Sequence, residues 1–235
     1  IARIIPKVSN KYSPLLKIDE KAAGKKTLAI VVSSNKGLCG GFNINLFRFI
    51  SHSIDFKEAD FVIIGKKGSY IGRLGGNITA DFSSPTPLNN ISAVFTMALE
   101  KFLKGEYKEI NLFYNKFVSV IKSVPTKLRI LPIKVDFKKE DPEFLMPVLE
   151  YKIEPSPEQI IDQLLKSYVQ EMIKNALIES EASEHSSRMM AMKNATDNAT
   201  DVIYNLTLLR NKIRQQNITY ELLDMVSAKE SVEIS

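Results

Sequence analysis

The five residues Gly37-Leu38-Cys39-Gly40-Gly41 are the part of the sequence with the clearest capacity for chemistry. A glycine-rich turn after a buried strand can direct backbone N–H groups at the phosphates of a bound nucleotide. These glycines do not have the G-x-G-x-x-G spacing, and the chain contains no G-x-x-x-x-G-K-[ST] motif. The next expected strand ends at Gly65-Lys66-Lys67, where a dinucleotide site would place an acidic residue for the ribose. We therefore expect the glycine loop (Gly37–Gly41) to serve packing or subunit contact, without a cofactor.

The other residues with catalytic or metal-binding potential are isolated along the chain. Cys39 is the only cysteine, which excludes an intrachain disulfide and disfavours a cysteine-based zinc site. It is expected to be a small buried residue. His52 and His185 are the only histidines, and neither belongs to a recognisable metal-ligand motif. No nucleophile–base pair can be assembled, so we expect no catalysis by this chain alone.

The elements around the glycine loop alternate between strand and helix patterns. Short β-branched runs predict strands, and apolar residues at helical spacing predict helices between them. The expected strands are 27–33, 61–64, 78–82, 110–114 and 128–133, and the expected helices are 44–54, 69–74 and 91–102. This alternation predicts an α/β domain with a Rossmann-like, mostly parallel sheet covered on both faces.

The last third of the chain predicts one very long helix. Ser156-Pro157-Glu158-Gln159 is a typical helix start, and residues 158–229 contain neither Pro nor Gly. Apolar or small residues keep helical spacing for some seventy residues, and such a helix would be roughly 105 Å long. The positions of this seam are 161, 164/165, 168, 172, 176, 180, 183, 187, 191, 195, 199, 202, 206, 209 and 213. Because a lone apolar seam is unfavourable in water, residues such as Leu164, Met172 and Val202 should meet another helix. The alternative is a hairpin that turns within Lys193–Thr200.

Charge and hydropathy exclude several classes of protein. Residues 1–156 carry a net charge of +9, whereas residues 157–229 and 230–235 each carry −2. The basic part has no interleaved aromatic residues of the RNA-binding kind, so we expect no nucleic-acid partner. The longest purely apolar run, Leu28–Val32, is far shorter than the ~20 residues of a spanning helix. We expect a soluble, intracellular chain that is at most peripheral to a membrane.

Three segments of the sequence resemble signatures of one family, the gamma subunit of F-type, proton-translocating ATP synthases. Residues 34–43 (SNKGLCGGFN) resemble its glycine loop, residues 183–199 resemble its Ser-Glu…Arg-Met…Ala-Met…Ala-Thr-Asp-Asn run, and residues 211–221 (NKIRQQNITYE) resemble its C-terminal motif. The resemblance covers essentially the whole chain. Two departures are Ser227-Ala228 in place of the family's Gly-Ala and the lack of a long N-terminal helix. Ile1, Ile4 and Ile5 have the spacing of the last turn of such a helix, so a truncated chain is expected.

The resemblance implies a central rotor stalk that transmits torque between the proton-driven c-ring and the catalytic alpha/beta ring. Its partners would be the alpha, beta and epsilon subunits and the c-ring. The chain would be peripheral to the membrane through the c-ring, on the cytoplasmic face of the cell membrane if bacterial or the matrix face of the mitochondrial inner membrane otherwise. It would carry no catalytic, cofactor-binding or metal-binding residue of its own.

The resemblance also implies contact residues and a domain organisation. The residues that would contact the beta subunit are Arg188, Met192, Arg214, Gln215, Thr219 and Glu221. Tyr151 and Glu154 would contact the c-ring, and the glycine loop contributes Gly37, Cys39, Gly40 and Gly41. Residues 1–20 would be a helix remnant and connector, residues 21–156 the α/β domain with its linker, and residues 157–235 the stalk helix, paired in an antiparallel coiled coil with the missing N-terminal helix.

A rival from another class is a nucleotide-binding α/β enzyme whose long helix is a dimerisation arm. The two hypotheses differ in a simple observable, because a bound nucleotide would stabilise the folded enzyme against heat.

Overall fold

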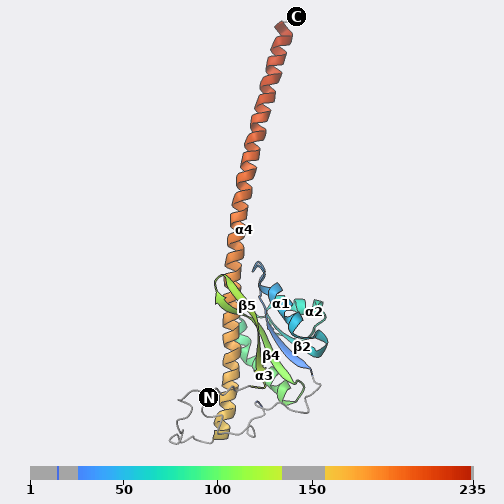
Figure 1. The fold of residues 1–235 in the computed structure, drawn as a ribbon, viewed down its shortest axis with the longest axis vertical. Helices are drawn as coiled ribbons and strands as arrows, with labels where there is room; N and C mark the ends of the chain where they lie inside the picture. The colour runs from blue at the N-terminus through green and yellow to red at the C-terminus, as the bar shows by residue number, and fades with distance from the viewer. Residues whose placement is uncertain (1–14, 16–25, 134–156, 234–235) are drawn as a thin grey trace, which may run out of the picture. The chain divides into compact units, whose positions relative to one another are not determined.

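The computed structural model describes Leu15, residues 26–133 and residues 157–233. The chain divides into two units, residues 1–188 and residues 189–235, and each is described by itself. The first unit contains a sheet with helices on both faces, and the second consists of helix in its described part (Figure 1).

A five-stranded sheet forms the centre of the first unit. Its order is β3-β2-β1-β4-β5, with β1, β2, β3 and β4 parallel and β5 antiparallel to β4. The strands are β1 (Thr27–Val32), β2 (Ala59–Ile64), β3 (Asn77–Asp81), β4 (Glu109–Ser119) and β5 (Lys122–Leu131). Every residue of β1 and β2 is buried, as expected for parallel strands covered on both faces. The mostly parallel α/β sheet predicted from the sequence is confirmed.

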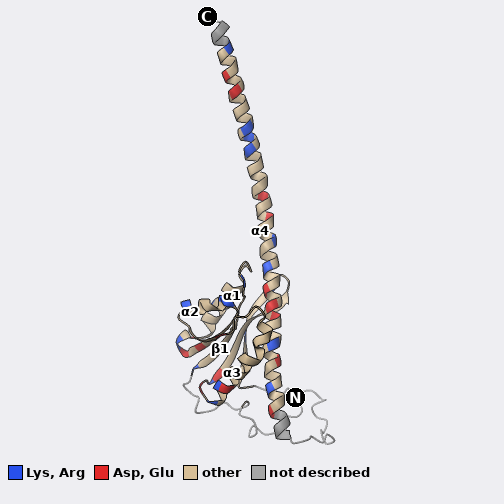
Figure 2. Ribbon diagram, turned by 180° about the vertical axis from the view of Figure 1, so that it is seen from behind, with Lys and Arg blue, Asp and Glu red and all other residues tan. Residues whose placement is uncertain are grey.

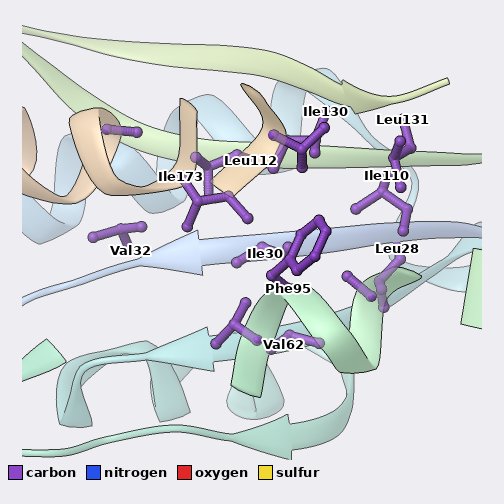
Figure 3. Close-up of a cluster of buried hydrophobic side chains, with 14 of the residues drawn as sticks. Leu28, Ile30, Val32, Val62, Phe95, Ile110, Leu112, Ile130, Leu131 and Ile173 are labelled. Carbon is purple, nitrogen blue, oxygen red and sulfur yellow. The ribbon is translucent and has the colours of Figure 1, made fainter. Parts of the chain in front are cut away.

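Helices cover the two faces of the sheet and create two separate cores. Along β1, Leu28, Ile30 and Val32 point to one face, whereas Ala29 and Val31 point to the other. The first face packs against α3 (Ile91–Leu103) and α4 (Pro157–Glu233), and Figure 3 shows Phe95 and Ile173 within this cluster. The second face packs against α1 (Phe42–Ser53) and α2 (Tyr70–Arg73). Three short 3₁₀ turns complete the described elements: η4 (Phe56–Glu58), η5 (Lys66–Ser69) and η6 (Pro87–Asn90).

The long helix predicted from the sequence is confirmed as the uninterrupted helix α4, and no hairpin turn occurs within Lys193–Thr200. Figure 2 shows positions of acidic and basic residues interleaved along its ribbon. The solvent exposure of its side chains differs along its length. In the sheet-bound segment (residues 162–188), one face is buried, whereas in the exposed segment (residues 189–229) nearly every side chain is exposed. The buried positions of the sheet-bound segment are Leu165, Val169, Ile173, Ala176, Leu177, Ser180 and Ser183.

Three details differ from the sequence-based expectation. The buried stripe of α4 includes Leu165 of the expected seam, but it continues through Val169 and Ile173, whereas Tyr168 and Met172 of that seam are not buried. Ile44 was expected on the apolar face of α1 but is 61% exposed. The strands β4 and β5 form a hairpin much longer than the apolar runs suggested. Residues 116–119 of β4 and most of the edge strand β5 are not buried, and such segments need no continuous apolar pattern. Pro125 lies within β5, where an edge strand tolerates it.

Candidate functional site

A compact network of side-chain hydrogen bonds connects the glycine loop to the start of α1. Ser34 follows β1 and is fully buried. Its backbone N–H donates to Asn43 Oδ1 (3.1 Å), and Asn43 Nδ2 donates to Ser34 Oγ (2.7 Å) and to Cys39 Sγ (3.3 Å). The Ser34 hydroxyl in turn donates to the Lys36 carbonyl (2.7 Å). Cys39 is 3% exposed, so it packs as the sequence suggested. The network fixes the loop shape by side-chain bonds that the spacing of glycines alone does not reveal.

A second set of contacts joins the loop to the neighbouring strand end. Asn35 Nδ2 donates to the Ser84 carbonyl (2.8 Å), and Asn35 Oδ1 accepts from the Lys66 N–H (3.2 Å). Gly65 has φ +97°, and a Cβ there would overlap the backbone carbonyl of Ser33. Gly65 is therefore required for the close approach of β2 to the end of β1. The sequence analysis treated this glycine only as a strand end.

Arg188 joins the glycine loop to α4. Its Nε donates to the Gly37 carbonyl (3.3 Å), and one terminal nitrogen donates to the Lys36 carbonyl (3.4 Å). The same nitrogen contacts Glu184 Oε1 at 2.6 Å, with the Arg188 and Glu184 side chains 23% and 18% exposed. The loop thus presents carbonyl oxygens to a cation on this side. A phosphate cradle would need N–H groups directed at the ligand, so this arrangement is that of a packing contact.

A cavity of about 380 Å³ lies beside this contact, at the carboxyl end of β1. Its lining combines Ser33, Asn35 and Lys36, which follow β1 and precede the glycine loop, with side chains of α4 that include Glu181, Glu184, His185 and Arg188. In doubly wound sheets, ligands bind outside the carboxyl ends of the strands where the order reverses. Here both signs of charge meet in that position, and His185 Nε2 lies 3.9 Å from Glu181 Oε1. The mixed charge favours a polar protein contact over a polyanionic nucleotide.

Asn115 connects the loop region with α4 from within the sheet. Asn115 is 1% exposed, and its Nδ2 donates to the Phe42 carbonyl at the start of α1 (3.2 Å). Its backbone carbonyl accepts from the hydroxyl of Ser183 (3.1 Å), which is fully buried. Its partner in β5 is Pro125, which has no backbone N–H to donate. In the sequence, Ser183 stands out only as part of a motif, and Asn115 belongs to none of the three motifs.

Within the glycine loop only Cys39 is buried, and the open surface of the loop is formed by its other four residues together with the exposed Lys36 that precedes them. Leu38 has φ 62° and is 73% exposed. A left-handed conformation is uncommon for leucine, and it persists only where the surroundings hold it. An apolar side chain held outward in this way suits contact with a partner.

The remaining candidate contact residues lie on the exposed segment of α4. Met192 is 38% exposed, and Arg214, Gln215, Thr219 and Glu221 are all exposed. At 100° per residue, Gln215 and Thr219 share one side of the helix, and Arg214 and Glu221 share another. The Thr219 hydroxyl donates to the Gln215 carbonyl of its own helix (2.9 Å). The structure therefore arranges these residues in two adjacent rows. Tyr151 and Glu154 lie outside the described residues.

A buried charge cluster at the opposite, amino end of the strands was not anticipated. Asp60 accepts hydrogen bonds from Lys26 Nζ (3.0 Å), Asn77 Nδ2 (2.8 Å) and the Tyr107 hydroxyl (3.0 Å). Burial alone would raise the pKa of Asp60, but these three hydrogen bonds and the Lys26 charge outweigh it and lower the pKa. Burial, followed by the bond to Asp60, raises the pKa of Tyr107. The cluster joins β1, β2, β3 and the start of β4, and its role is structural.

The described residues contain no group of three or more His, Cys, Asp or Glu side chains placed to hold a metal ion. Across the same ranges, no helix has the length and apolar character needed to cross a membrane.

Comparison with known sequences gives consistent matches. A family model described as ATP synthase matches residues 1–232. The ATP synthase gamma chain of Bdellovibrio bacteriovorus is 34% identical over 247 residues, which cover 96% of this chain and 80% of that protein.

Comparison with solved structures supports the same fold. The chain is similar to one chain of the Euglena gracilis mitochondrial ATP synthase OSCP/F1/c-ring structure in rotational state 3, with a TM-score of 0.67, 18% identity and coverage of 96% of this chain and 80% of that one. A chain of the Euglena rotor in rotational state 1 matches with a TM-score of 0.62, 15% identity and coverage of 92% and 87%. A chain of the Tetrahymena thermophila central stalk/c-ring structure matches with a TM-score of 0.54, 21% identity and coverage of 83% and 92%. At these identities the structural matches show the fold alone.

Proposed function

Because this chain belongs to the ATP synthase gamma-chain family, we propose that it is the central rotor stalk that transmits torque between the c-ring and the catalytic alpha/beta ring. In this role the α/β domain (residues 21–156) is the base of the rotor, and residues 157–235 are its shaft. The chain itself performs no catalysis and moves no proton. It is peripheral to the membrane, on the cytoplasmic face in a bacterium.

The single observation that carries this proposal is the uninterrupted 77-residue helix α4. Torque transmission needs a stiff element that is anchored at one end and free to contact partners elsewhere. The sheet-bound segment supplies the anchor, since Leu165, Val169 and Ile173 are each at most 1% exposed. The exposed segment supplies the contact surface, where large apolar side chains such as Leu209 are 52% exposed. Such residues gain from burial against a second helix and the surrounding subunits.

We further propose two contact zones with the beta subunit. One consists of the open surface of the glycine loop together with Arg188, and the other lies on the exposed segment of α4 and consists of Met192, Arg214, Gln215, Thr219 and Glu221. The intrachain bonds of Arg188 use only part of its five donors, so a partner carboxylate could still bind it. Tyr151 and Glu154 are proposed as c-ring contacts on the resemblance of their segment alone.

The test is a rotation assay on the ATP synthase of the source organism carrying this chain. A bead is attached through a cysteine introduced at the exposed position 104 (Lys104→Cys), with Cys39→Ser as background, and the alpha/beta ring is fixed to a surface. We expect ATP to drive stepwise rotation of the bead in one direction. Hydrolysis at full rate with a stationary bead would contradict the proposal.

Isothermal titration of the chain with ATP and ADP addresses the rival enzyme hypothesis. A saturable heat that disappears on Gly40→Val would favour a nucleotide site at the loop. Absence of such heat, together with rotation, supports the stalk function.

A further inference from the structure

A groove on the outer surface of α1 and α2 has no role in the contacts described above. Its volume is about 570 Å³, and it lies between α1 on one side and the η5–α2 segment on the other. Phe47 of α1 and Tyr70 of α2 both line it, with their rings stacked at 5.6 Å between centroids and 27° between planes. Ile44, Tyr70 and Leu74 are 61%, 46% and 39% exposed. Three large apolar side chains gathered along one groove favour a binding surface over scattered surface residues.

The lining residues have the spacing of a helix-binding groove. On α1 they are Ile44, Phe47 or Arg48, and Ser51, and on the opposite wall they are Lys67, Tyr70 and Leu74. On each wall the lining residues therefore recur every three to four positions along the sequence. They span about two helical turns, which corresponds to a length of roughly 10 Å. A groove between two such walls accommodates the apolar face of another helix, whose anchors also recur at i, i+3 or i+4, and i+7.

The charge of the groove determines the chemistry of its occupant. Arg48 and Lys67 line it, both are exposed, and no carboxylate is among the lining residues. Within the described part of the chain, neither cation forms an ion pair. The face around α2 adds Lys66 and Arg73, which are also exposed. A basic rim around an apolar groove is complementary to an amphipathic helix that carries Asp or Glu beside its apolar face.

We propose that this groove binds a short acidic amphipathic helix of another polypeptide. The apolar face of that helix lies on Phe47 and Tyr70, and its carboxylates pair with Arg48 and Lys67. This inference does not depend on the rotor function, because it uses neither α4 nor the glycine loop.

The experiment measures binding of two fluorescent helical peptides to the full chain by anisotropy. Both peptides have the same leucine face, and they differ in carrying Glu or Lys beside it. We expect the acidic peptide to bind about tenfold more tightly at low salt, since a tenfold difference corresponds to two modest ion pairs. The difference should shrink in high salt because the paired groups are exposed. Equal binding of the two peptides, or no binding of either, would overturn the proposal.

Matched variants locate the binding to the groove. Arg48→Glu with Lys67→Glu should reverse the preference, and Tyr70→Ala should weaken both peptides. Lys57→Glu with Lys104→Glu makes the same change in charge at exposed positions outside the groove and should leave the preference intact, apart from a small general effect. If the control pair acts as strongly as the groove pair, the peptides sense net charge only and the proposal fails.

A second measurement tests whether the groove is occupied by a second copy of this chain and not by an acidic helix of another polypeptide. Sedimentation of the full chain with and without Ile44→Asp shows whether the groove is covered by another copy. A dimer that Ile44→Asp dissociates would replace the acidic partner with a second copy of this chain. We expect the sedimentation of the two proteins to be the same.

Discussion

Residues 162–188 and residues 189–229 belong to the same helix, but their side chains face different surroundings. In the sheet-bound segment, Ile173 is fully buried and Ser183 is bonded to a strand carbonyl. In the exposed segment, Val202, Leu209 and Tyr220 are 55%, 52% and 65% exposed. Both segments have helical sequences free of Gly and Pro. The comparison separates two functions of apolar residues: in the first segment they hold the chain together, and in the second they are available to partners.

The largest expected effect tests this separation directly. Ile173→Ala removes a fully buried side chain, and it should lower the free energy of unfolding by about 2–5 kcal/mol. Leu209→Ala changes a residue that is 52% exposed, and it should shift the same quantity by less than about 0.5 kcal/mol. Urea unfolding followed by tyrosine fluorescence measures both. A large cost for Leu209→Ala in the isolated chain would mean that the exposed segment is packed in solution.

The sequence predicted the helix well and its buried face only in part: Ala176, Ser180 and Ser183 of the expected seam are buried, whereas Tyr168 and Met172 are not. Absence of Gly and Pro and a typical helix start are local properties, so the extent of α4 could be read from the residues themselves. The choice between Tyr168 and Val169 as the buried position depends on the shape of the sheet, which no local pattern contains. The same reason explains Ile44, an apolar residue that the periodicity assigned to the core and that lines a surface groove instead.

The site was predictable where its residues form contiguous motifs, and it was missed where they do not. The glycine loop and Arg188 were identified in two motifs, but their contact joins residues separated by about 150 positions, which only the fold brings together. Asn115 and Asp60 occur in no motif, and their importance comes from burial and from hydrogen bonds between different strands. A buried polar residue within an otherwise apolar strand was the only available signal.

A second prediction concerns the acid stability of the unit that contains the sheet-bound segment. Asp60→Asn should lower the free energy of unfolding by about 1–3 kcal/mol at neutral pH, because the charged acceptor of three hydrogen bonds is lost. The folded-state pKa of Asp60 is lowered, so its stabilising contribution is present above the ordinary value of 3.8 and is lost as the pH falls through the lowered value. Unfolding curves of wild type and Asp60→Asn should therefore converge in strong acid.

The control for that prediction is Asp201→Asn, which changes an exposed carboxylate of the exposed segment. It should leave the neutral-pH stability unchanged. A pH profile of wild type that is the same as that of Asp60→Asn at every pH would show that the cluster contributes nothing.

A smaller effect compares two hydroxyl groups on the same helix. Ser183→Ala removes a buried donor from the Asn115 carbonyl and should cost about 1 kcal/mol. Thr200→Ala removes a hydroxyl that donates to the Thr196 carbonyl of its own helix in an exposed position, and its effect on stability should be close to zero. Hydrogen exchange adds a local readout, since amides of the β4–β5 hairpin should exchange faster in Ser183→Ala only. Equal changes in stability and in hydrogen exchange in both variants would show that the buried hydrogen bond contributes no more to stability than the exposed one.

The smallest expected effect on stability is also the sharpest test of function. Arg214 and Gln215 are exposed and lie on adjacent rows of the exposed segment, so Arg214→Ala with Gln215→Ala should leave the unfolding of the isolated chain unchanged. In the assembled enzyme the proposed contacts place the guanidinium fork against a carboxylate and the amide against polar groups, in a setting where water is largely excluded. Such a partly desolvated, charge-assisted pair is worth about 1–3 kcal/mol, compared with less than about 1 kcal/mol on an open surface.

The double variant should therefore reduce ATP turnover or weaken assembly without unfolding the chain. The matched control is Arg210→Ala, which removes a cation one turn earlier on the same exposed segment, outside the proposed contact set. Steady-state ATP hydrolysis and subunit content after gel filtration separate loss of coupling from loss of assembly. If turnover and assembly remain at wild-type level in the double variant, Arg214 and Gln215 are not contact residues. The exposed segment would then act through its apolar side chains alone, which Leu209→Ser in the assembled enzyme would test at the same sensitivity.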